Sequence, residues 1–594
     1  MYVLGLSCYY HDSAAALVKD GMLVAAAAEE RFVRRKHTSE FPEKAVEYCL
    51  KVAGININQV DHICFYEKPF VKFDRILINI LSEFPRSYFS FLKSIPLWMK
   101  DRLWMKSKIQ EALGIEKEIL FSQHHLSHAA AAFLVSPFER AAILTVDGVG
   151  EWCTTGMGYG EGNQIHMEKE IDFPHSLGLF YSALTAYLGF KVNDAEWKVM
   201  GLAPYGVPRY VDKFNEIIDI KSDGSFRLNL KYFSHHYATK LPFSRHYENL
   251  FGQVTRDPES EITQFHKDMA ASGQKVVEKV MVTMAQNAYN TYKTENICIA
   301  GGVGLNSVAN WKILKNTPFR NIFIQPAAGD DGAAIGAAFI VYNTVLNNPR
   351  RFVMTHAYWG PEFTNAEIKA FLDSTNIRYQ ELSEAEMLKK TARLIADDKV
   401  VGWFQGRMEF GPRALGGRSI LANPSNPEMK NIINSKIKFR EWFRPFAPSV
   451  LRESVSKYFD MQGDSPFMLL VPDVLQDKRA LLPAITHEDG TGRVQTVTES
   501  DNPLYYKLIK EFENISGIPV VVNTSFNVRG EPIVCSPADA YNCFIRTGID
   551  ALVMGNYVLT EKPFTNIYTE EEIVELEGAV KLAKKGKTTA DSLV

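Results

Sequence analysis

Short apolar runs alternate with polar or glycine-containing turns at the start of the chain. The runs cover residues 2–7, 14–20 and 23–32, and the polar segment CYYHDS lies between the first two. Runs of this length between turn residues predict β-strands joined as hairpins. The pattern returns after residue 140 as AAILTVD, CTTGMGYGEGN and QIHMEKEID, with helical sequence such as PEKAVEYCLKVAG between the copies. The chain therefore predicts an α/β domain built from two βββα-type units.

A glycine-rich turn follows a third apolar strand of this domain. A long helical stretch at 264–292 leads to the strand NICIA, which runs into Gly301, Gly302 and Gly304 before another helix. Glycines there allow a nucleotide to approach the backbone and the helix N-terminus, and the spacing matches neither a Rossmann nor a Walker motif. Two βββα units with such loops are the internal duplication of actin-like and sugar-kinase-type ATPases. A simple turn is the alternative interpretation of the glycines.

A linker divides the chain. Residues 347–364, NNPRRFVMTHAYWGPEFT, are rich in proline, glycine and polar side chains, which indicates a domain boundary. We expect a first domain at 1–355 and a second α/β domain at 365–594. The second domain is predicted to open with a helix over EAEMLKKTARLIADD and a strand over KVVGWFQG, and to close with a helix at 570–586. A length of 594 residues agrees with two domains, because single cores stop growing at about 250–300 residues.

Composition narrows the class of protein. With 46% hydrophobic and 23% charged residues the chain is globular, and a net charge of -3 argues against a general affinity for nucleic acid or anionic membranes. Seven cysteines without a CxxC pair, no signal-peptide features and no apolar run of ~20 residues predict a cytoplasmic protein with buried thiols. For the aromatic stretch at 69–104, packing within the fold or a dimer interface is favoured over an amphipathic membrane anchor.

One pair of histidines has the spacing of a shared ligand site. His124 and His128 lie four residues apart in an alanine-rich stretch, so a helix would place both imidazoles on one face. Asp147 directly follows the strand AAILTV, and Asp330 follows the strand NIFI after a short loop. Together these side chains would suit iron, manganese or zinc rather than calcium. A zinc-protease motif is excluded because His125 stands where HExxH requires glutamate. The alternative interpretation is that the two histidines lie on a solvated helix face and that Asp147 belongs to an ordinary turn.

Cations concentrate at 407–444. Eight of them face three acidic residues, namely Arg407, Arg413, Arg418, Lys430, Lys436, Lys438, Arg440 and Arg444 against Glu409, Glu428 and Glu441. Because they alternate with turns and core aromatics, a phosphate site is favoured over a solvated basic face. Arg493 follows a glycine turn, and Asn523 and Ser525 end a buried strand where they suit a planar amide or a ribose. An Asx or ST turn is the alternative there.

Ten motifs in order over nearly the whole chain carry a family resemblance: HDSAAALVKDG, EERF followed by KH, HHLSHAAAA, KVMGLAPYG, GGVGLNS, GDDGAAIGAA, FGPRALGGRS, FRPFAPSV, DGTGRVQTV and NTSFN. On these motifs the chain resembles the NodU/CmcH-type O-carbamoyltransferases. The resemblance implies a first domain similar to the TsaD-type ATPase of tRNA threonylcarbamoylation and a YrdC-like second domain. It also implies two steps, in which carbamoyl phosphate and ATP form carbamoyl adenylate and the carbamoyl group then passes to a hydroxyl of a small natural product.

The resemblance also implies residue roles. Carbamoyl phosphate and nucleotide would be held in the second domain by Arg413, Lys438, Arg444, Arg493, Asn523 and Ser525. The nucleotide would also contact Lys36, Gly301, Gly302, Gly304 and Asn306 of the first domain. The metal would bind to His124, His128, Asp147 and Asp330, with Fe2+ expected, another divalent ion as the alternative, and Mg2+ accompanying ATP. His11 and Asp12 would position or deprotonate the acceptor hydroxyl.

Two other functions stay open. A tRNA threonylcarbamoylation-type enzyme would need a substantial basic surface, and an actin-like regulatory ATPase would lack transfer chemistry. We expect a small-molecule alcohol, carbamoyl phosphate and ATP as partners, neither nucleic acid nor membrane, and leave a homodimer open. No motif encodes the acceptor. Because carbamoyl adenylate hydrolyses readily, we expect a tight interface that excludes water between the two domains.

Overall fold

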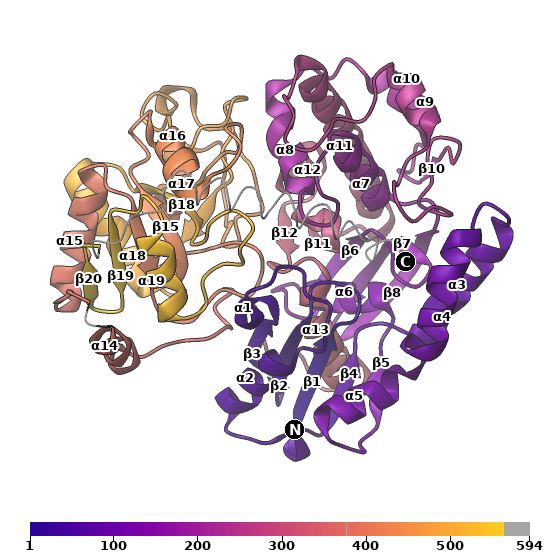
Figure 1. The fold of residues 1–594 in the computed structure, drawn as a ribbon, viewed down its shortest axis with the longest axis horizontal. Coiled ribbons are helices and arrows are strands. Elements are labelled where there is room, and N and C mark those ends of the chain that lie inside the picture. The colour runs from indigo at the N-terminus through magenta and orange to yellow at the C-terminus, as the bar shows by residue number, and fades with distance from the viewer. Residues whose placement is uncertain (376, 563–594) are drawn as a thin grey trace.

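The computed structural model describes residues 1–375 and 377–562, which form two lobes (Figure 1). The first lobe contains two five-stranded sheets, and the second lobe, orange and yellow in Figure 1, contains an eight-stranded sheet. The predicted mixed α/β architecture is confirmed. The helix predicted at 570–586 lies outside the described residues.

The two sheets of the first lobe have the same topology. The first contains β1 (Tyr2–Ser7), β2 (Ala14–Lys19), β3 (Met22–Ala28), β4 (His62–Phe65) and β5 (Ile119–Phe121). The second contains β6 (Arg140–Val146), β7 (Cys153–Glu161), β8 (Gln164–Asp172), β11 (Asn296–Ala300) and β12 (Asn321–Ile324). The orders are β3-β2-β1-β4-β5 and β8-β7-β6-β11-β12. In each sheet the first strand pairs antiparallel with its hairpin partner and parallel with the next strand. The duplication predicted from the apolar pattern is therefore present.

Helices surround these sheets. They are α1 (Glu30–Val33), α2 (Glu43–Ala53), α3 (Pro69–Ser82), α4 (Tyr88–Lys100), α5 (Met105–Leu113), α6 (His124–Phe133), α7 (Leu177–Tyr187), α8 (Glu196–Leu202), α9 (Val211–Ile217), α10 (Arg245–Phe251), α11 (Gln264–Tyr292), α12 (Ser307–Asn316) and α13 (Asp330–Phe339). A small sheet pairs β9 (Ile218–Ile220) with β10 (Phe226–Leu228). The strand predicted to reach residue 32 ends at Ala28, because the charged segment EER cannot continue a buried strand and begins α1 instead.

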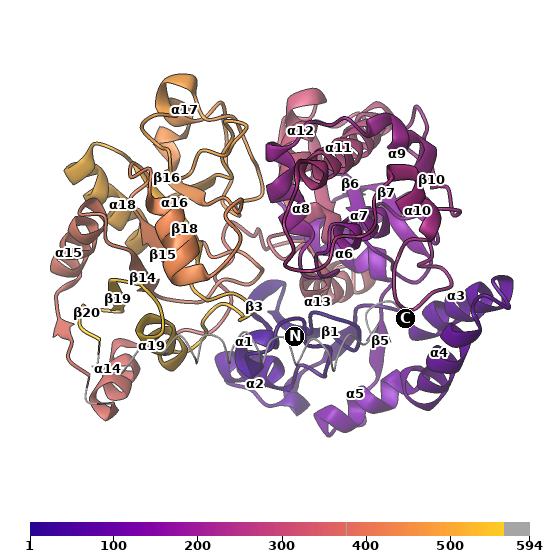
Figure 2. The ribbon, with the colours of Figure 1, turned by 45° about the horizontal axis from the view of Figure 1, so that its top comes forward.

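Helices α6 and α13 pack against each other between the two sheets, with α13 against β1 and α6 against β6 and β11 (Figure 2). Their close approach depends on glycine. A Cβ on Gly336 would lie 1.8 Å from the Ser127 carbonyl oxygen, and a Cβ on Gly5 would lie 1.9 Å from the Ala334 carbonyl oxygen. The two glycines therefore fix the position of α13, whose first residue is Asp330.

Gly336→Ala is expected to lower the free energy of unfolding by about 2 kcal/mol or more, because the added methyl must push α13 away from α6. The same displacement should weaken divalent-ion binding, since Asp330 moves relative to His128. Thermal unfolding and cobalt titration measure the two effects. Gly201→Ala is the matched helical control, because its Cβ would meet only Pro445 Cδ at 3.4 Å. Equal behaviour of the two variants would contradict the packing argument.

The second lobe is built on one mixed sheet in the order β13-β20-β19-β14-β15-β18-β16-β17. Its strands are β13 (Gln380–Glu381), β14 (Val401–Phe404), β15 (Arg418–Ala422), β16 (Ala447–Leu451), β17 (Gln495–Val497), β18 (Val520–Ser525), β19 (Ala551–Met554) and β20 (Tyr557–Leu559). Its helices are α14 (Asn365–Ser374), α15 (Glu384–Ala396), α16 (Met429–Ile433), α17 (Val455–Tyr458), α18 (Pro503–Ser516) and α19 (Pro537–Ile545). The prediction that α15 opens this lobe was wrong, because the Thr364–Glu367 capping box starts α14 earlier.

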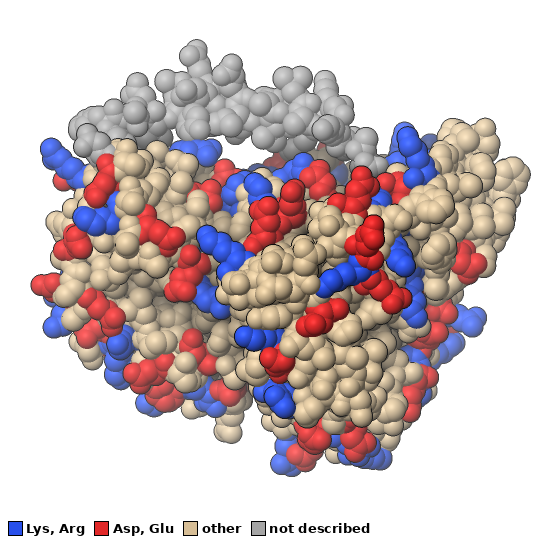
Figure 3. Space-filling view, turned by 90° about the horizontal axis from the view of Figure 1, so that it is seen from below, with Lys and Arg blue, Asp and Glu red and all other residues tan. Residues whose placement is uncertain are grey.

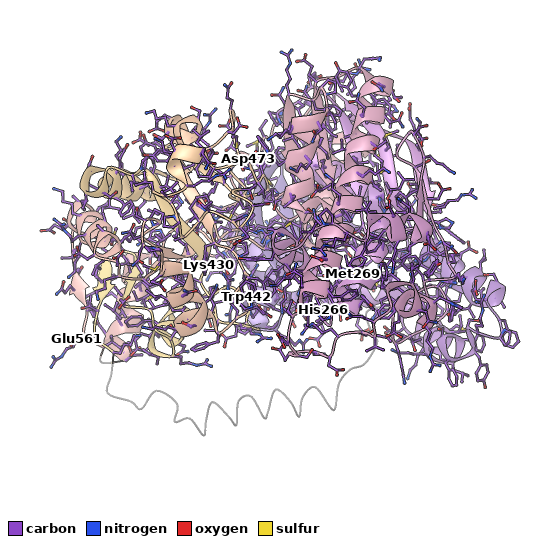
Figure 4. The ribbon with its side chains drawn as sticks, turned by 90° about the horizontal axis from the view of Figure 1, so that it is seen from above. His266, Met269, Lys430, Trp442, Asp473 and Glu561 are labelled. Carbon is purple, nitrogen blue, oxygen red and sulfur yellow. The ribbon has the colours of Figure 1, made fainter. Side chains whose placement is uncertain are left out.

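Polar contacts close the interface between the lobes. Lys198 Nζ lies 2.7 Å from Glu441 Oε1, and Arg31 donates a 2.9 Å hydrogen bond to the Gly411 carbonyl. In Figure 4, Lys430 and Trp442 of the second lobe lie on the side that faces His266 and Met269 of α11. There Lys430 donates to the Tyr205 hydroxyl at 2.8 Å. The lobes thus form the close interface expected from the chemistry.

Helices α3 and α4 form a hairpin at the right edge of Figure 1. Its inner side is a small apolar cluster, whereas Phe70, Leu81, Phe84, Phe89 and Met99 are each 60–75% exposed. Figure 3 shows a mostly tan surface in this part of the molecule. Of the two expectations for 69–104, packing within the fold holds for the inner side, and a dimer interface on the exposed side stays a prediction. No helix within the described ranges combines the length and apolar character needed to cross a membrane.

Candidate metal cluster and interlobe cation cluster

Two histidines and two aspartates meet at one point of the first lobe. His124 and His128 lie one turn apart on α6, and His124 Nε2 lies 3.1 Å from both His128 Nε2 and Asp147 Oδ2. Asp330 Oδ1 lies 3.5 Å from Nε2 of each histidine. The four predicted metal residues are brought together, since one donor atom of each lies within 4.8 Å of the others. We call them the metal cluster.

The spacing of the donor atoms fits a shared divalent ion. Nitrogen and oxygen ligands lie about 2.1 Å from such an ion, so tetrahedral ligands are roughly 3.4 Å apart, and the observed separations are 3.1–3.7 Å. Asp330 Oδ1 is buried and has no hydrogen-bond partner in the described part of the chain. Burial opposes a charge on His124, but Asp330 and Asp147 raise its pKa well above the usual value. The cluster therefore favours a cation, and its donors suit iron, manganese or zinc.

Carboxylates behind the cluster orient its first histidine. Glu67 Oε2 lies 3.6 Å from His124 Nδ1, and Glu151 accepts hydrogen bonds from the His124 and Lys68 backbone amides. Burial alone would raise the pKa of Glu67, but Lys72 and then His124 lower it to about 2. Sequence reasoning missed both glutamates, because they stand in no recognisable spacing to the histidines.

A chain of alternating acids and histidines leads away from the cluster. His11 Nε2 lies 3.8 Å from Asp330 Oδ2, and His11 Nδ1 lies 2.8 Å from Asp12 Oδ2. Asp12 Oδ1 then lies 2.7 Å from His37 Nδ1, and His37 Nε2 lies 3.0 Å from Asp194 Oδ1. The structure thus places the predicted catalytic pair beside the metal cluster. His37 and Asp194 were missed, although His37 stands in the KH motif.

This acid–histidine chain is an ion-pair network. Asp12, Glu30 and His37 also have donor atoms within 4.8 Å of one another. Both nitrogens of His37 already face carboxylates, however, and Glu30 pairs with Arg31 at 3.1 Å. Lys36 extends the network, with Nζ 3.9 Å from Asp194.

Stability should depend on the charge of His37. Burial opposes that charge, but Asp12 and then Asp194 raise the pKa of His37 to about 10, against about 6.5 when unfolded. The stabilisation is complete below pH 6.5 and is lost as the pH rises through 10. The thermal midpoint of the wild type should therefore fall more between pH 7 and 10 than that of His37→Gln. Parallel pH profiles would contradict this assignment.

The predicted glycine loop supports Asp147. Gly301 has φ +90° and a Cβ there would lie 2.3 Å from the Val146 carbonyl, while the Gly302 amide donates to Asp147 Oδ1 at 2.8 Å. Asn306 caps α12 and exchanges hydrogen bonds with Gln274. Gly304 lies in the same turn. These protein contacts occupy the side chain of Asn306, and the nucleotide contact of the loop stays a prediction.

Four arginines of the second lobe gather with little compensation. Arg413, Arg440, Arg444 and Arg493 are partly buried, and each has a buried guanidinium nitrogen without a hydrogen-bond partner among the described residues. Burial lowers the pKa of Arg413 to about 10. Burial followed by the charges of Arg413 and Arg444 lowers the pKa of Arg493 well below its usual value. We call this group the cation cluster. Arg440 also donates from Nε to Asn434 Oδ1 at 2.6 Å, and Arg444 pairs with Glu441 at 3.4 Å. Arg413 and Arg493 make no hydrogen bond to the described residues and provide forks for an anion.

The remaining predicted residues of this lobe have protein partners. Lys438 Nζ donates to the Asn527 carbonyl at 2.9 Å, to Asn527 Oδ1 at 2.8 Å and to the Ser525 carbonyl. Asn523 donates to Ala414, Ser449 and Gln495 within the lobe. Lys438 and Asn523 therefore stabilise the protein around the cation cluster. A direct contact with a ligand stays a prediction for them and for Ser525.

Residues at the interface join the two clusters. The Arg444 guanidinium lies 3.8 Å from the ring centroid of Trp197 in the first lobe, and Glu441 beside it pairs with Lys198. The negative charge of Asp194 acts on Arg444 across the interface. The acid–histidine chain therefore leads from the metal cluster toward the interface, and a closed passage between the two clusters stays a prediction.

Comparisons with known proteins identify the family to which the chain is similar. The family model described as carbamoyltransferase N-terminus matches residues 2–339, and the one described as carbamoyltransferase C-terminus matches residues 392–561. An uncharacterized protein of Synechocystis is 50% identical, with 94% of this chain and 97% of that protein covered. Nodulation protein NolNO of Sinorhizobium fredii is 37% identical, with 93% and 79% covered.

Among solved structures, HypF of T. kodakarensis matches with a TM-score of 0.31 and 14% identity over 58% of this chain and 48% of that one, a distant likeness that adds nothing to the assignment. The family resemblance inferred from the motifs is confirmed by the two family models. Because the N-terminal match alone covers more than half of the sequence, the chain belongs to the carbamoyltransferase family.

Proposed function

We propose that the protein is an ATP-dependent O-carbamoyltransferase that makes carbamoyl adenylate in the second lobe and transfers the carbamoyl group to an alcohol in the first. The carrying observation is the row of acid–histidine contacts that leads from the buried histidine and aspartate cluster to Asp194, whose charge acts on Arg444 of the other lobe. An actin-like, TsaD-type first lobe and a YrdC-like second lobe belong to this proposal, and the duplicated sheets support the former.

In the first step the cation cluster binds the phosphates. Arg413, Arg493 and Arg444 offer unpaired N–H groups to carbamoyl phosphate and to the phosphates of ATP. A carbamate oxygen attacks the α-phosphorus, and pyrophosphate leaves. The carbamate arises when one water molecule cleaves carbamoyl phosphate and phosphate leaves. Carbamoyl phosphate, ATP and water thus give carbamoyl adenylate, pyrophosphate and phosphate. The guanidinium groups stabilise the charge that develops on the leaving oxygens.

In the second step the acceptor oxygen bonds to the carbamoyl carbon of the adenylate in the first lobe, the bond from that carbon to the phosphate oxygen breaks, and AMP leaves. His11 and Asp12, which contact each other at 2.8 Å beside Asp330, would position the acceptor hydroxyl or accept its proton. A divalent ion held by His124, His128, Asp147 and Asp330 would supply Lewis-acid stabilisation of phosphate charge. Closure of the interface keeps water from the adenylate.

Exchange of labelled pyrophosphate into ATP tests the first step. The exchange should depend on carbamoyl phosphate and need no acceptor. A tRNA-directed enzyme would instead show a rate that rises with tRNA, and a regulatory ATPase would hydrolyse ATP regardless of carbamoyl phosphate. Absence of exchange that depends on carbamoyl phosphate would overturn the proposal.

A further inference from the structure

A cavity of about 60 Å3 lies between the α3–α4 hairpin and two segments of the first lobe at 173–179 and 235–238. None of its lining residues belongs to the cation cluster. The side chains that matter for its chemistry are Tyr10, Arg75, Phe173, His235 and His236.

The cavity adjoins the metal cluster. Tyr10 precedes His11, and their ring centroids are 4.6 Å apart. Val149, another lining residue, belongs to the turn that follows Asp147. Two loops therefore contribute both to the cavity and to the proposed transfer site, so the cavity lies next to that site.

Arg75 is a buried cation in this cavity that Glu67 and Glu151 stabilise only from beyond ion-pair distance. Its side chain is 6% exposed, and Nε is buried without a hydrogen-bond partner. Within the described residues no hydrogen bond or ion pair satisfies its guanidinium, which lies 4.9 Å from the ring centroid of Phe173. A buried charge without a partner is costly, and a guanidinium fork matches a carboxylate or another anionic oxygen group.

The rest of the wall is neutral or apolar. Burial lowers the pKa of His235 and of His236 to about 4, so both are uncharged at neutral pH. Their Nδ1 atoms are buried without hydrogen-bond partners in the described part of the chain. Phe173 and Ile76 add apolar surface suited to the face of a ring. A polycationic acceptor would meet Arg75 with repulsion and find no carboxylate in this lining.

We propose that this cavity is the part of the acceptor subsite that takes the anionic oxygen group of a hydroxylated molecule, which Arg75 binds. The proposal rests on the proposed function, and it assigns the acceptor class that the motifs leave open. Arg75 acts in recognition, and the histidines and Phe173 accommodate the remaining hydroxyls and ring face.

Binding of glucuronic acid, glucose and glucosamine to the full chain tests this. The three probes share a ring and differ in charge, and calorimetry or ligand-observed NMR measures their dissociation constants. Glucuronic acid should bind at least 10-fold more tightly than glucose, and glucosamine most weakly. Equal binding of the three by the wild-type protein would overturn the proposal without any variant.

Variants then identify the residue. Arg75→Gln should abolish the preference for glucuronic acid, Arg75→Lys should keep part of it, and Arg320→Gln, a 75% exposed arginine of the same lobe, should keep all of it. Pyrophosphate exchange should be unchanged in all three. A preference that survives in a folded Arg75→Gln protein would contradict the role of Arg75. Absence of pyrophosphate exchange in the wild type would instead contradict the proposed function. The binding of the three sugars would still test the role of Arg75.

Discussion

Replacing His124 or His128 with alanine is expected to reduce carbamoyl transfer by about 100-fold or more while pyrophosphate exchange stays near the wild-type rate. Each substitution removes one of four donor atoms that converge within 4.8 Å, and it leaves Asp147 and Asp330 with a single histidine beside them. Changes that only disturb such ligands already cost about 10–100-fold in metal affinity or activity. The cation cluster lies in the other lobe, so adenylate formation should continue. Metal content, exchange and acceptor carbamoylation are the three measurements.

His125→Gln is the control for that experiment. His125 lies on the same helix and is buried to the same degree, but its Nδ1 lies 2.8 Å from Thr145 Oγ1 and no atom of it belongs to the metal cluster. Its substitution should leave transfer within a few-fold of the wild type. If His128→Ala and His125→Gln lose transfer equally, or if His128→Ala loses exchange and transfer together, the division of labour between the lobes is wrong.

The parts of this site that local sequence encodes were predictable. A four-residue spacing on a helix places His124 and His128 on one face whatever the rest of the chain does. Short apolar runs between turn residues specify β1 to β3 and β6 to β8, and the duplication follows from their repetition. Asp147 could be assigned because the apolar run ends directly before it.

Contacts that depend on the assembled fold were not predictable. His37 and Asp194 lie 157 residues apart and meet only once the loops of the two repeats are in place. Arg75 looks like one charge of an amphipathic helix, and only the cavity shows that it has no partner. For the α3–α4 hairpin the pattern gives an apolar face but does not say whether protein covers it, which is why the predicted packing held for one side alone.

Burial alone does not distinguish a structural arginine from a binding one, and the second lobe contains both. Arg418 is fully buried and donates hydrogen bonds to the carbonyls of Gln405, Gly406 and Pro361. Arg493 is partly buried, makes no hydrogen bond to the described residues, and lies near the like charges of Arg413 and Arg444. Arg418 therefore stabilises the folded lobe, whereas the buried charge of Arg493 destabilises it.

Arg493→Met is expected to lower pyrophosphate exchange by about 100-fold or more, the usual cost of removing one group that stabilises developing charge. Its thermal midpoint without ligand should stay equal or rise, because the substitution removes repulsion within the cation cluster. The depressed pKa of Arg493 gives the same sign, since its charged form is disfavoured in the folded state. Carbamoyl phosphate should raise the midpoint of the wild type and fail to raise that of the variant.

Arg418→Met is expected to do the opposite of Arg493→Met, lowering stability more than exchange. It leaves several buried carbonyls without a donor, so the free energy of unfolding should fall by about 3 kcal/mol or more. Exchange measured on the protein that remains folded should be much less affected than in Arg493→Met. If Arg493→Met loses as much stability as Arg418→Met, Arg493 is a structural residue of the lobe. If carbamoyl phosphate does not change the melting temperature of the wild type, the cation cluster does not bind that substrate. The separation of the two arginines therefore tests whether the unpaired charge in this lobe is there for the fold or for the anion.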